Sequence, residues 1–321
     1  MTAVLPEPRS ALVIGASGHV GAAVTRRLVD AGWSATIMLR ATSDRSRLGP
    51  VLSKVRTIYA DLTRVDECRD EIIALAPTVI YFAGWHGVTS QQRNSPEQIT
   101  INIPAFLSLL QIARVARTRR FVGIGSQAEY GPCNSVITEA TPCRPVSAYG
   151  AAKFAASSLG AEYCRRVGLE FVWLRLFSAY GPADDATHML PQLICGLLGG
   201  TPPPLTSGVQ PWEYLYIDDV ADAIVAAATA PKALGIFNLS SGEPVTVRSV
   251  IEQVRDLIDP KIALSLGQVP LSNEASWGIR ADISRLCTAT GWHPRTPIAV
   301  GLAETVHWFR ARQRPPVCQE N

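Results

Sequence analysis

The chain has 321 residues, of which 47 % are hydrophobic and 18 % are charged, so it is long enough and apolar enough to fold around a substantial core. The formal net charge is only +3 and no basic run is interleaved with aromatic residues, which argues against a nucleic-acid partner. The start, MTAVLPEPRS, lacks the apolar segment of a signal peptide, and no stretch approaches about 18 uninterrupted apolar residues, so we expect a cytoplasmic protein without a membrane partner.

The seven cysteines and five histidines are dispersed along the chain. No two cysteines have the CxxC spacing, and no two histidines have the spacing of a zinc-binding helix. We therefore expect reduced thiols and no metal site.

Short apolar runs alternate with amphipathic stretches, which predicts a parallel sheet covered by helices on both faces. The expected strands are 11–14, 35–39, 55–59, 78–82, 120–124, 169–177 and 235–239. The expected helices are 22–31, 96–117, 147–167, 217–229, 247–258 and 298–310.

Prolines and glycines cluster between residues 181 and 211, where we place the start of a second lobe. The predicted fold is α/β. A Rossmann-type, doubly wound parallel sheet occupies residues 1–177 and is rejoined by about 212–242, and a smaller mixed substrate-binding lobe comprises 178–211 and 243–321.

Three glycines, Gly15, Gly18 and Gly21, separate the first expected strand from the first expected helix. Glycine allows a tight turn and a close approach of the backbone to a pyrophosphate, which then lies at the positive end of the helix. The motif predicts a dinucleotide site, although a purely structural turn is the alternative.

The second expected strand ends at Arg40, followed by Ser43 and Arg45. An acidic residue at this point favours the ribose 2′-hydroxyl of NAD, whereas a cation suits the 2′-phosphate of NADP. We therefore expect NADP(H) as the cofactor; an exposed arginine that simply begins a loop is the alternative.

Tyr149 and Lys153 lie four residues apart and therefore on one face of the expected helix. A lysine ammonium near a phenol favours the phenolate and lowers its pKa, which suits a proton donor or acceptor. The same spacing also occurs on solvated helix faces.

The chain resembles the extended short-chain dehydrogenase/reductases, and specifically the NAD(P)-dependent epimerase/dehydratase family that modifies nucleotide sugars. The resemblance rests on motifs spread nearly end to end: GASGHVG, Asp61-Leu62, Ala83-Gly84, Asn102, IGSQAEYG at 124–131, YGAAK, RLFSAYGP at 175–182, YIDDVADA at 216–223 and the tail at 281–309. With the glycine turn and the residues around Arg40, it implies a cofactor site made of Gly15, Ser17, Gly18, His19, Val20, Gly21, Arg40, Ser43, Arg45, Asp61, Leu62, Ala83, Gly84, Asn102, Tyr149 and Lys153.

The resemblance also implies a catalytic triad of Ser126, Tyr149 and Lys153, in which Tyr149 gives a proton to the oxygen of a reduced carbonyl and Ser126 hydrogen-bonds that oxygen. The 4,6-dehydratases of the family place Asp and Glu directly after the triad hydroxyl, where this chain has Gln127 and Ala128. Glu129 comes one residue later, and we expect it to point elsewhere. What remains is chemistry that needs a hydride and one proton.

Substrate contacts are expected from seven residues on both sides of the cleft: Trp85, His86, Gln127, Ser178, His188, Trp212 and Arg280. Ser178 replaces the asparagine usual in the family, and Trp212-Glu213 replaces a common Arg-Asp pair, so ligands of the substrate diphosphate are missing. His188 as an ordinary loop residue and Trp212 as a packing residue are the alternatives.

We expect an enzyme that uses NADPH to reduce a nucleotide-linked 4-keto-6-deoxy sugar, similar to the 4-ketoreductases of deoxysugar biosynthesis. The alternatives are a nucleotide-sugar 4-epimerase with bound NAD, a reductase of a non-sugar carbonyl, and a non-catalytic NADP sensor. The resemblance further implies a homodimer formed through the helices at 96–117 and 147–167.

Overall fold

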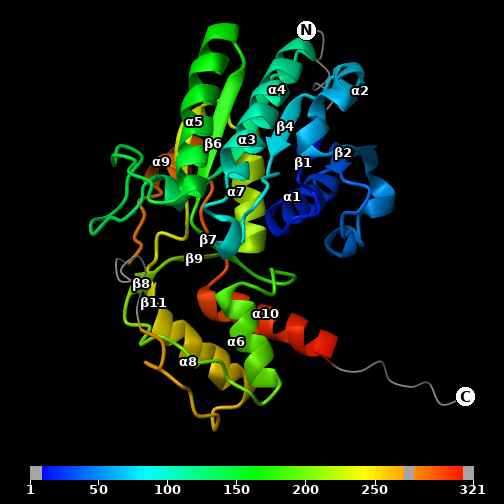
Figure 1. The fold of residues 1–321 in the computed structure, drawn as a ribbon. Helices are drawn as coiled ribbons and strands as arrows, with labels where there is room; N and C mark the ends of the chain where they lie inside the picture. The colour runs from blue at the N-terminus through cyan, green and yellow to red at the C-terminus, as the bar shows by residue number, and fades with distance from the viewer. Residues whose placement is uncertain (1–8, 271–277, 314–321) are drawn as a thin grey trace, which may run out of the picture.

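The computed structural model describes residues 9–270 and 278–313, which form two lobes (Figure 1). The larger lobe is built on a seven-stranded sheet with the order β10-β6-β5-β4-β1-β2-β3, in which all neighbours are parallel. Its strands are β1 (Ser10–Ile14), β2 (Ser34–Leu39), β3 (Arg56–Tyr59), β4 (Val79–Phe82), β5 (Arg120–Ser126), β6 (Glu170–Leu176) and β10 (Gly235–Leu239). The expected Rossmann-type fold is confirmed.

Both faces of the sheet are buried under helices. Successive side chains of a strand point to opposite faces and therefore enter two different cores. Ala11 and Val13 of β1 join the core under α1 (His19–Asp30) and α7 (Ile217–Thr229). Leu12 and Ile14 join the opposite core, under α2 (Arg69–Leu75), α4 (Asn102–Val115) and α5 (Ala148–Val167). Uninterrupted apolar strands follow from this double burial.

The expected helix at 96–117 is divided in the structure into α3 (Glu97–Thr100) and α4. Pro104 has no backbone N–H to donate to the carbonyl of Thr100, so the helical hydrogen bonds cannot run unbroken through this turn. Among the described residues, the 97–115 stretch is the one helical segment long and apolar enough to span a membrane, and it packs against α2 and α5.

The smaller lobe contains α6 (Met189–Leu198), α8 (Val247–Ile258) and α10 (Ile298–Gln313), which pack together below the sheet in Figure 1. Its core includes Leu193, Val250 and Leu302. Two short ladders connect it to the larger lobe: β7 (Ser178–Tyr180) with β9 (Tyr214–Tyr216), and β8 (Pro211–Trp212) with β11 (Val245–Thr246).

One helix departs from the domain boundaries expected from the sequence. The segment 243–321 was assigned to the substrate-binding lobe, but α9 (Ser284–Thr290) packs against α7 and β10 of the larger lobe. Leu286 and Trp292 are buried in the core beneath α1 and α7. This apolar packing holds the segment around α9 against the larger lobe.

Short 3-10 helices occur at Ser46–Leu48, Leu52–Lys54, Leu62–Cys68, Ser90–Gln92 and Gln127–Glu129.

Candidate active site

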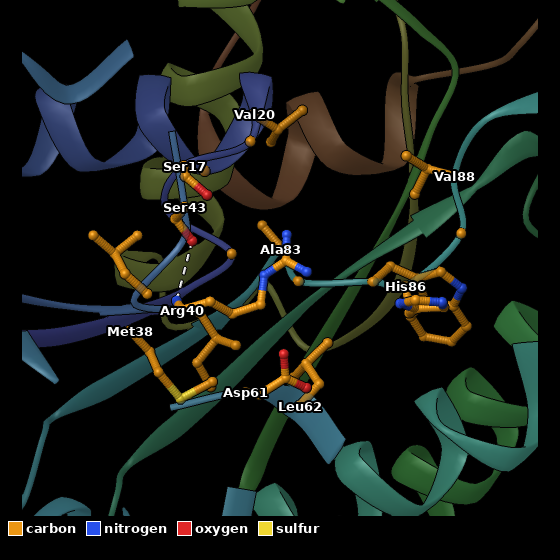
Figure 2. Close-up of a pocket in the computed structure, with 18 of the residues that line it drawn as sticks. Ser17, Val20, Met38, Arg40, Ser43, Asp61, Leu62, Ala83, His86 and Val88 are labelled. Atoms are coloured by element: carbon orange, nitrogen blue, oxygen red, sulfur yellow. Dashed lines mark hydrogen bonds between the residues drawn. The ribbon is translucent and has the colours of Figure 1, made fainter. Parts of the chain in front are cut away.

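A cavity of about 490 Å³ opens at the carboxyl ends of β1, β2 and β4, where the strand order reverses (Figure 2). This is where parallel α/β sheets place their ligands, and the volume is typical of a small-molecule site. It brings together most of the predicted cofactor residues: Gly15, Ser17, Gly18, His19, Val20, Gly21, Arg40, Ser43, Asp61, Leu62, Ala83 and Gly84.

The glycine turn has no room for side chains at two of its positions. Gly15 adopts φ +81°, and a Cβ there would overlap the backbone of Gly84. A Cβ at Gly21 would overlap the carbonyl oxygen of Gly15. The first turn of α1 has no side-chain cap, so its N–H groups remain available to an anion. This cradle fits the pyrophosphate of a dinucleotide.

Arg40 provides a cation in this cavity, and its side chain points into it in Figure 2. The Arg40 N–H donates to Ser43 Oγ at 3.1 Å, which fixes the loop after β2. Asp44, four residues after Arg40, accepts hydrogen bonds from Ser46. Arg45 stacks on the ring of Tyr59 at 5.4 Å and does not line the cavity.

Asp61 also lines the cavity, below Arg40 in Figure 2, and its side chain caps the 3-10 helix Leu62–Cys68. A hydrogen bond from the Thr63 N–H lowers the pKa of its carboxyl group, and the charge of Arg40 lowers it further. A cation and an anion therefore face the expected adenosine end of the cofactor.

Ser126 ends β5, and its hydroxyl oxygen accepts a hydrogen bond from the Ala128 N–H at 3.2 Å. Tyr149 lies in the first turn of α5, beside this hydroxyl. Burial raises the pKa of the Tyr149 phenol, and its hydrogen bond with Ser126 opposes that rise. The structure thus brings the predicted hydroxyl pair together.

Lys153 is buried, and its Nζ donates to the carbonyl oxygen of Ile124 at 2.6 Å. The ammonium lies 3.8 Å from the ring centre of Trp85, against 5.9 Å from that of Tyr149. Burial lowers the pKa of Lys153 to about 7, although the charge of Glu129 opposes this effect. The resemblance implies that Lys153 tunes Tyr149 and holds the nicotinamide ribose; in the structure its ammonium lies near Tyr149 and also contacts the Ile124 carbonyl and the Trp85 indole.

Glu129 is fully buried and points into the protein core. Its carboxylate accepts hydrogen bonds from the Ser126 N–H at 2.9 Å, from Trp173 Nε1 at 2.8 Å and from Arg175 Nε at 2.8 Å. As expected, it points elsewhere: it fixes the turn that carries Ser126.

Asn102 is also buried, but it lies behind the pocket wall. Its Oδ1 accepts from the His86 N–H at 2.7 Å, and its Nδ2 donates to the His86 carbonyl oxygen at 3.0 Å. The side chain expected to touch the cofactor is therefore occupied in shaping the 86–87 loop.

The predicted substrate residues fall into two groups. Trp85 and Gln127 lie at the catalytic centre: Trp85 packs edge-on against Tyr149 at 6.4 Å, and the buried Gln127 Oε1 has no partner among the described residues. His86 lines the cavity.

The remaining four belong to the second lobe or its boundary. Trp212 Nε1 donates to Ser178 Oγ at 2.6 Å, so these two side chains bind each other. His188 Nδ1 lies 2.9 Å from Asp184 Oδ1, and this contact raises its pKa. Arg280 is exposed.

Two residues near the centre were missed from the sequence. Arg93 places its guanidinium 5.2 Å from the ring centre of Tyr149. Asp184 lies between His188 and His19. Burial lowers the pKa of His19 to about 4. Neither has a periodic or spaced motif that could have identified it. No cluster of three or more potential metal ligands occurs among the residues the structure describes.

Comparisons with known proteins agree with this geometry. The dTDP-glucose 4,6-dehydratase of Streptomyces niveus is 24 % identical over 311 residues, covering 93 % of this chain and 92 % of the relative. The UDP-glucose 4-epimerase of Corynebacterium glutamicum is 27 % identical over 303 residues, covering 88 % and 90 %. The dTDP-glucose 4,6-dehydratase from Bacillus anthracis in complex with NAD shares the fold with a TM-score of 0.84 at 18 % identity, covering 94 % of this chain and 97 % of that one.

Residues 11–240 match the model of the NAD dependent epimerase/dehydratase family. This range contains the glycine cradle, the residues that line the cavity and the Ser126–Tyr149–Lys153 cluster. That match covers most of the chain, which therefore belongs to this family of extended short-chain dehydrogenase/reductases.

Proposed function

We propose that the protein catalyses hydride transfer at carbon 4 of a nucleotide-linked hexose, with Tyr149 exchanging the proton. One observation carries this proposal: a Ser126–Tyr149 hydroxyl pair beside a dinucleotide cradle, with no acid at positions 127 and 128. The nucleotide-sugar substrate class is supported by the names of the relatives, which act on dTDP-glucose or UDP-glucose.

The bound dinucleotide would be held by the glycine turn and Arg40 and would supply or accept the hydride. When carbon 4 is a ketone, its oxygen gains negative charge during reduction and needs one proton. Tyr149 donates that proton and Ser126 hydrogen-bonds the oxygen. In the reverse direction, the ionised Tyr149 takes the proton from the carbon-4 hydroxyl.

Dehydration is disfavoured because it needs additional proton transfers at carbons 5 and 6. Gln127 and Ala128 have no ionisable group. The carboxylate of Glu129 is engaged by Arg175, Trp173 and the backbone of Ser126. We therefore assign proton exchange to Tyr149 among the described residues of the site.

Two outcomes of this chemistry are candidates. The epimerase relative and the guanidinium over Tyr149, which favours a proton-accepting phenolate, support 4-epimerisation. The second candidate is the net reduction of a 4-keto-6-deoxy sugar by NADPH. Arg40 supports it, because a cation in the cofactor cavity suits the 2′-phosphate of NADPH, the usual donor of reducing equivalents.

A substrate panel tests the proposal and separates these outcomes. Incubation with nucleotide-linked hexoses should interconvert carbon-4 epimers without net cofactor change, or incubation with 4-keto-6-deoxyhexoses should consume NADPH. Tyr149→Phe should lower turnover by about 100-fold or more while leaving dinucleotide binding intact. Full turnover by Tyr149→Phe, or loss of water from the hexose, would refute the proposed chemistry.

We further propose that the cavity prefers NADP(H) over NAD(H), since Arg40 lies in it and Asp44 is turned toward Ser46. Arg40→Ala should weaken NADPH binding by about 10-fold or more, because charge-assisted hydrogen bonds to a phosphate are worth about 1.5–3 kcal/mol. NADH binding should change little.

Fluorescence titration of both cofactors measures this effect, and Arg45→Ala is the matched control. Arg45 is a neighbouring cation that stacks on Tyr59 outside the cavity, so its removal should leave both affinities nearly unchanged. Equal affinity of the unaltered protein for NADH and NADPH would contradict the preference.

We also propose that the protein is a cytoplasmic homodimer formed through α3, α4 and α5, which pack together (Figure 1). These helices expose apolar side chains, among them Ile99, Phe154 and Leu159. Leu159→Glu should give a monomer in sedimentation experiments, because a charge would be buried between subunits. Leu257→Glu, at a comparably exposed leucine on α8, is the control and should leave the dimer intact. If the unaltered protein is a monomer, the proposed interface is wrong.

A further inference from the structure

We propose that Arg93 is a positioning residue that acts together with Lys153 to stabilise the phenolate form of Tyr149. The inference rests on the proposed function, because it takes Tyr149 as the proton-exchanging group. It concerns a residue in the loop after β4, far from the triad in the sequence.

The backbone fixes Arg93 at the start of α5. The first N–H groups of a helix have no partner within it, and this loop supplies two. The Tyr149 N–H donates to the Arg93 carbonyl oxygen at 2.8 Å, and the Ala148 N–H donates to Asn94 Oδ1 at 3.0 Å. The position of residue 93 is therefore set by main-chain contacts and not by its own side chain.

From this anchor the guanidinium lies over the aromatic face of Tyr149, with Cζ 5.2 Å from the ring centre. A cation over an aromatic face is attracted by the ring, and far more strongly by a ring that carries a full negative charge. No ion pair joins Arg93 to an acid within the part of the chain that the structure describes, so its charge is not neutralised there. The arrangement favours the ionised phenol.

Lys153 shares this role with other contacts, and its ammonium lies 5.9 Å from the Tyr149 ring centre, against 5.2 Å for the Arg93 guanidinium. Its ammonium donates to the Ile124 carbonyl oxygen, and the indole of Trp85 is closer to it than the ring of Tyr149. Burial lowers its pKa to about 7. An arginine guanidinium keeps its charge at every working pH.

The other charged groups around Tyr149 do not replace Arg93. The negative charge of Glu129 raises the pKa of Tyr149, whereas the Ser126 hydrogen bond and the Arg93 charge lower it. Across the cleft, the hydrogen bond to Asp184 raises the pKa of His188, and Arg93 opposes this rise. The charge of Arg93 thus acts on Tyr149 and on His188.

The test measures the ionisation of Tyr149 directly. The tyrosinate absorbance is titrated in the unaltered protein, Arg93→Gln and Arg93→Lys, and in each case the titration of the matching Tyr149→Phe form is subtracted. Arg93→Gln should move the Tyr149 ionisation upward by about one pH unit, since an opposite charge at this range shifts a pKa by about one to three units. Arg93→Lys should retain most of the effect.

Turnover should change in parallel. Because a higher pKa leaves less phenolate at a given pH, the rising limb of kcat in the direction that removes a proton from the substrate should move upward by the same amount in Arg93→Gln. At neutral pH this is a loss of about 10-fold in kcat for each unit. Arg248→Gln, at an exposed arginine on α8 outside the proposed dimer interface, is the matched control and should change neither quantity.

An unchanged titration in Arg93→Gln would overturn the inference. A second contradicting result is a change in KM only for substrates with a carboxylate on the sugar, with an unchanged pH profile. Arg93 would then bind the substrate and not stabilise the phenolate. These failures differ from failure of the proposed function, in which Tyr149→Phe itself retains full activity. The hydrogen bond that fixes residue 93 at the start of α5 is made by its backbone carbonyl. Both variants should therefore fold, and thermal unfolding of each variant checks this.

Discussion

All seven strands of the central sheet are parallel, so their carboxyl ends meet at one edge, and this constraint organises the whole site. The glycine turn follows β1, Arg40 follows β2, Ala83 follows β4 and Ser126 ends β5. Residues more than 100 positions apart in the sequence thereby line adjacent parts of one cleft. The covering helix α5 then brings Tyr149 and Lys153 to the same edge.

Burial at this edge decides which groups carry charge. Lys153 and Glu129 are both removed from water, a costly arrangement unless each charge finds partners. Glu129 finds three donors and becomes part of the scaffold under Ser126. Lys153 finds a carbonyl and an indole face, and burial lowers its pKa. The exposed Arg93 is under no such penalty, which is why it can keep a charge beside Tyr149.

Local sequence signals predicted the strands of the central sheet, the glycine cradle and the Tyr149–Lys153 pair, because each depends on residues close in the chain. Ser126 was added to that pair by the family resemblance. The local signals did not predict contacts made by loops. Whereas the break before α4 follows from Pro104, the return of α9 to the sheet and the Trp212–Ser178 pair depend on tertiary packing. Arg93 was missed for the same reason: its place over Tyr149 is set by the way its loop caps α5, which no periodicity records.

The central claim is that the reaction moves one hydride at carbon 4 and one proton through Tyr149. The most direct test is to run the reaction in deuterium oxide and locate deuterium in the sugar product by mass spectrometry and NMR. Ordinary hydrogen is expected at carbons 5 and 6, since Tyr149 exchanges its proton at the carbon-4 oxygen and Gln127 and Ala128 have no ionisable group. Deuterium at carbon 5 or 6 would contradict it.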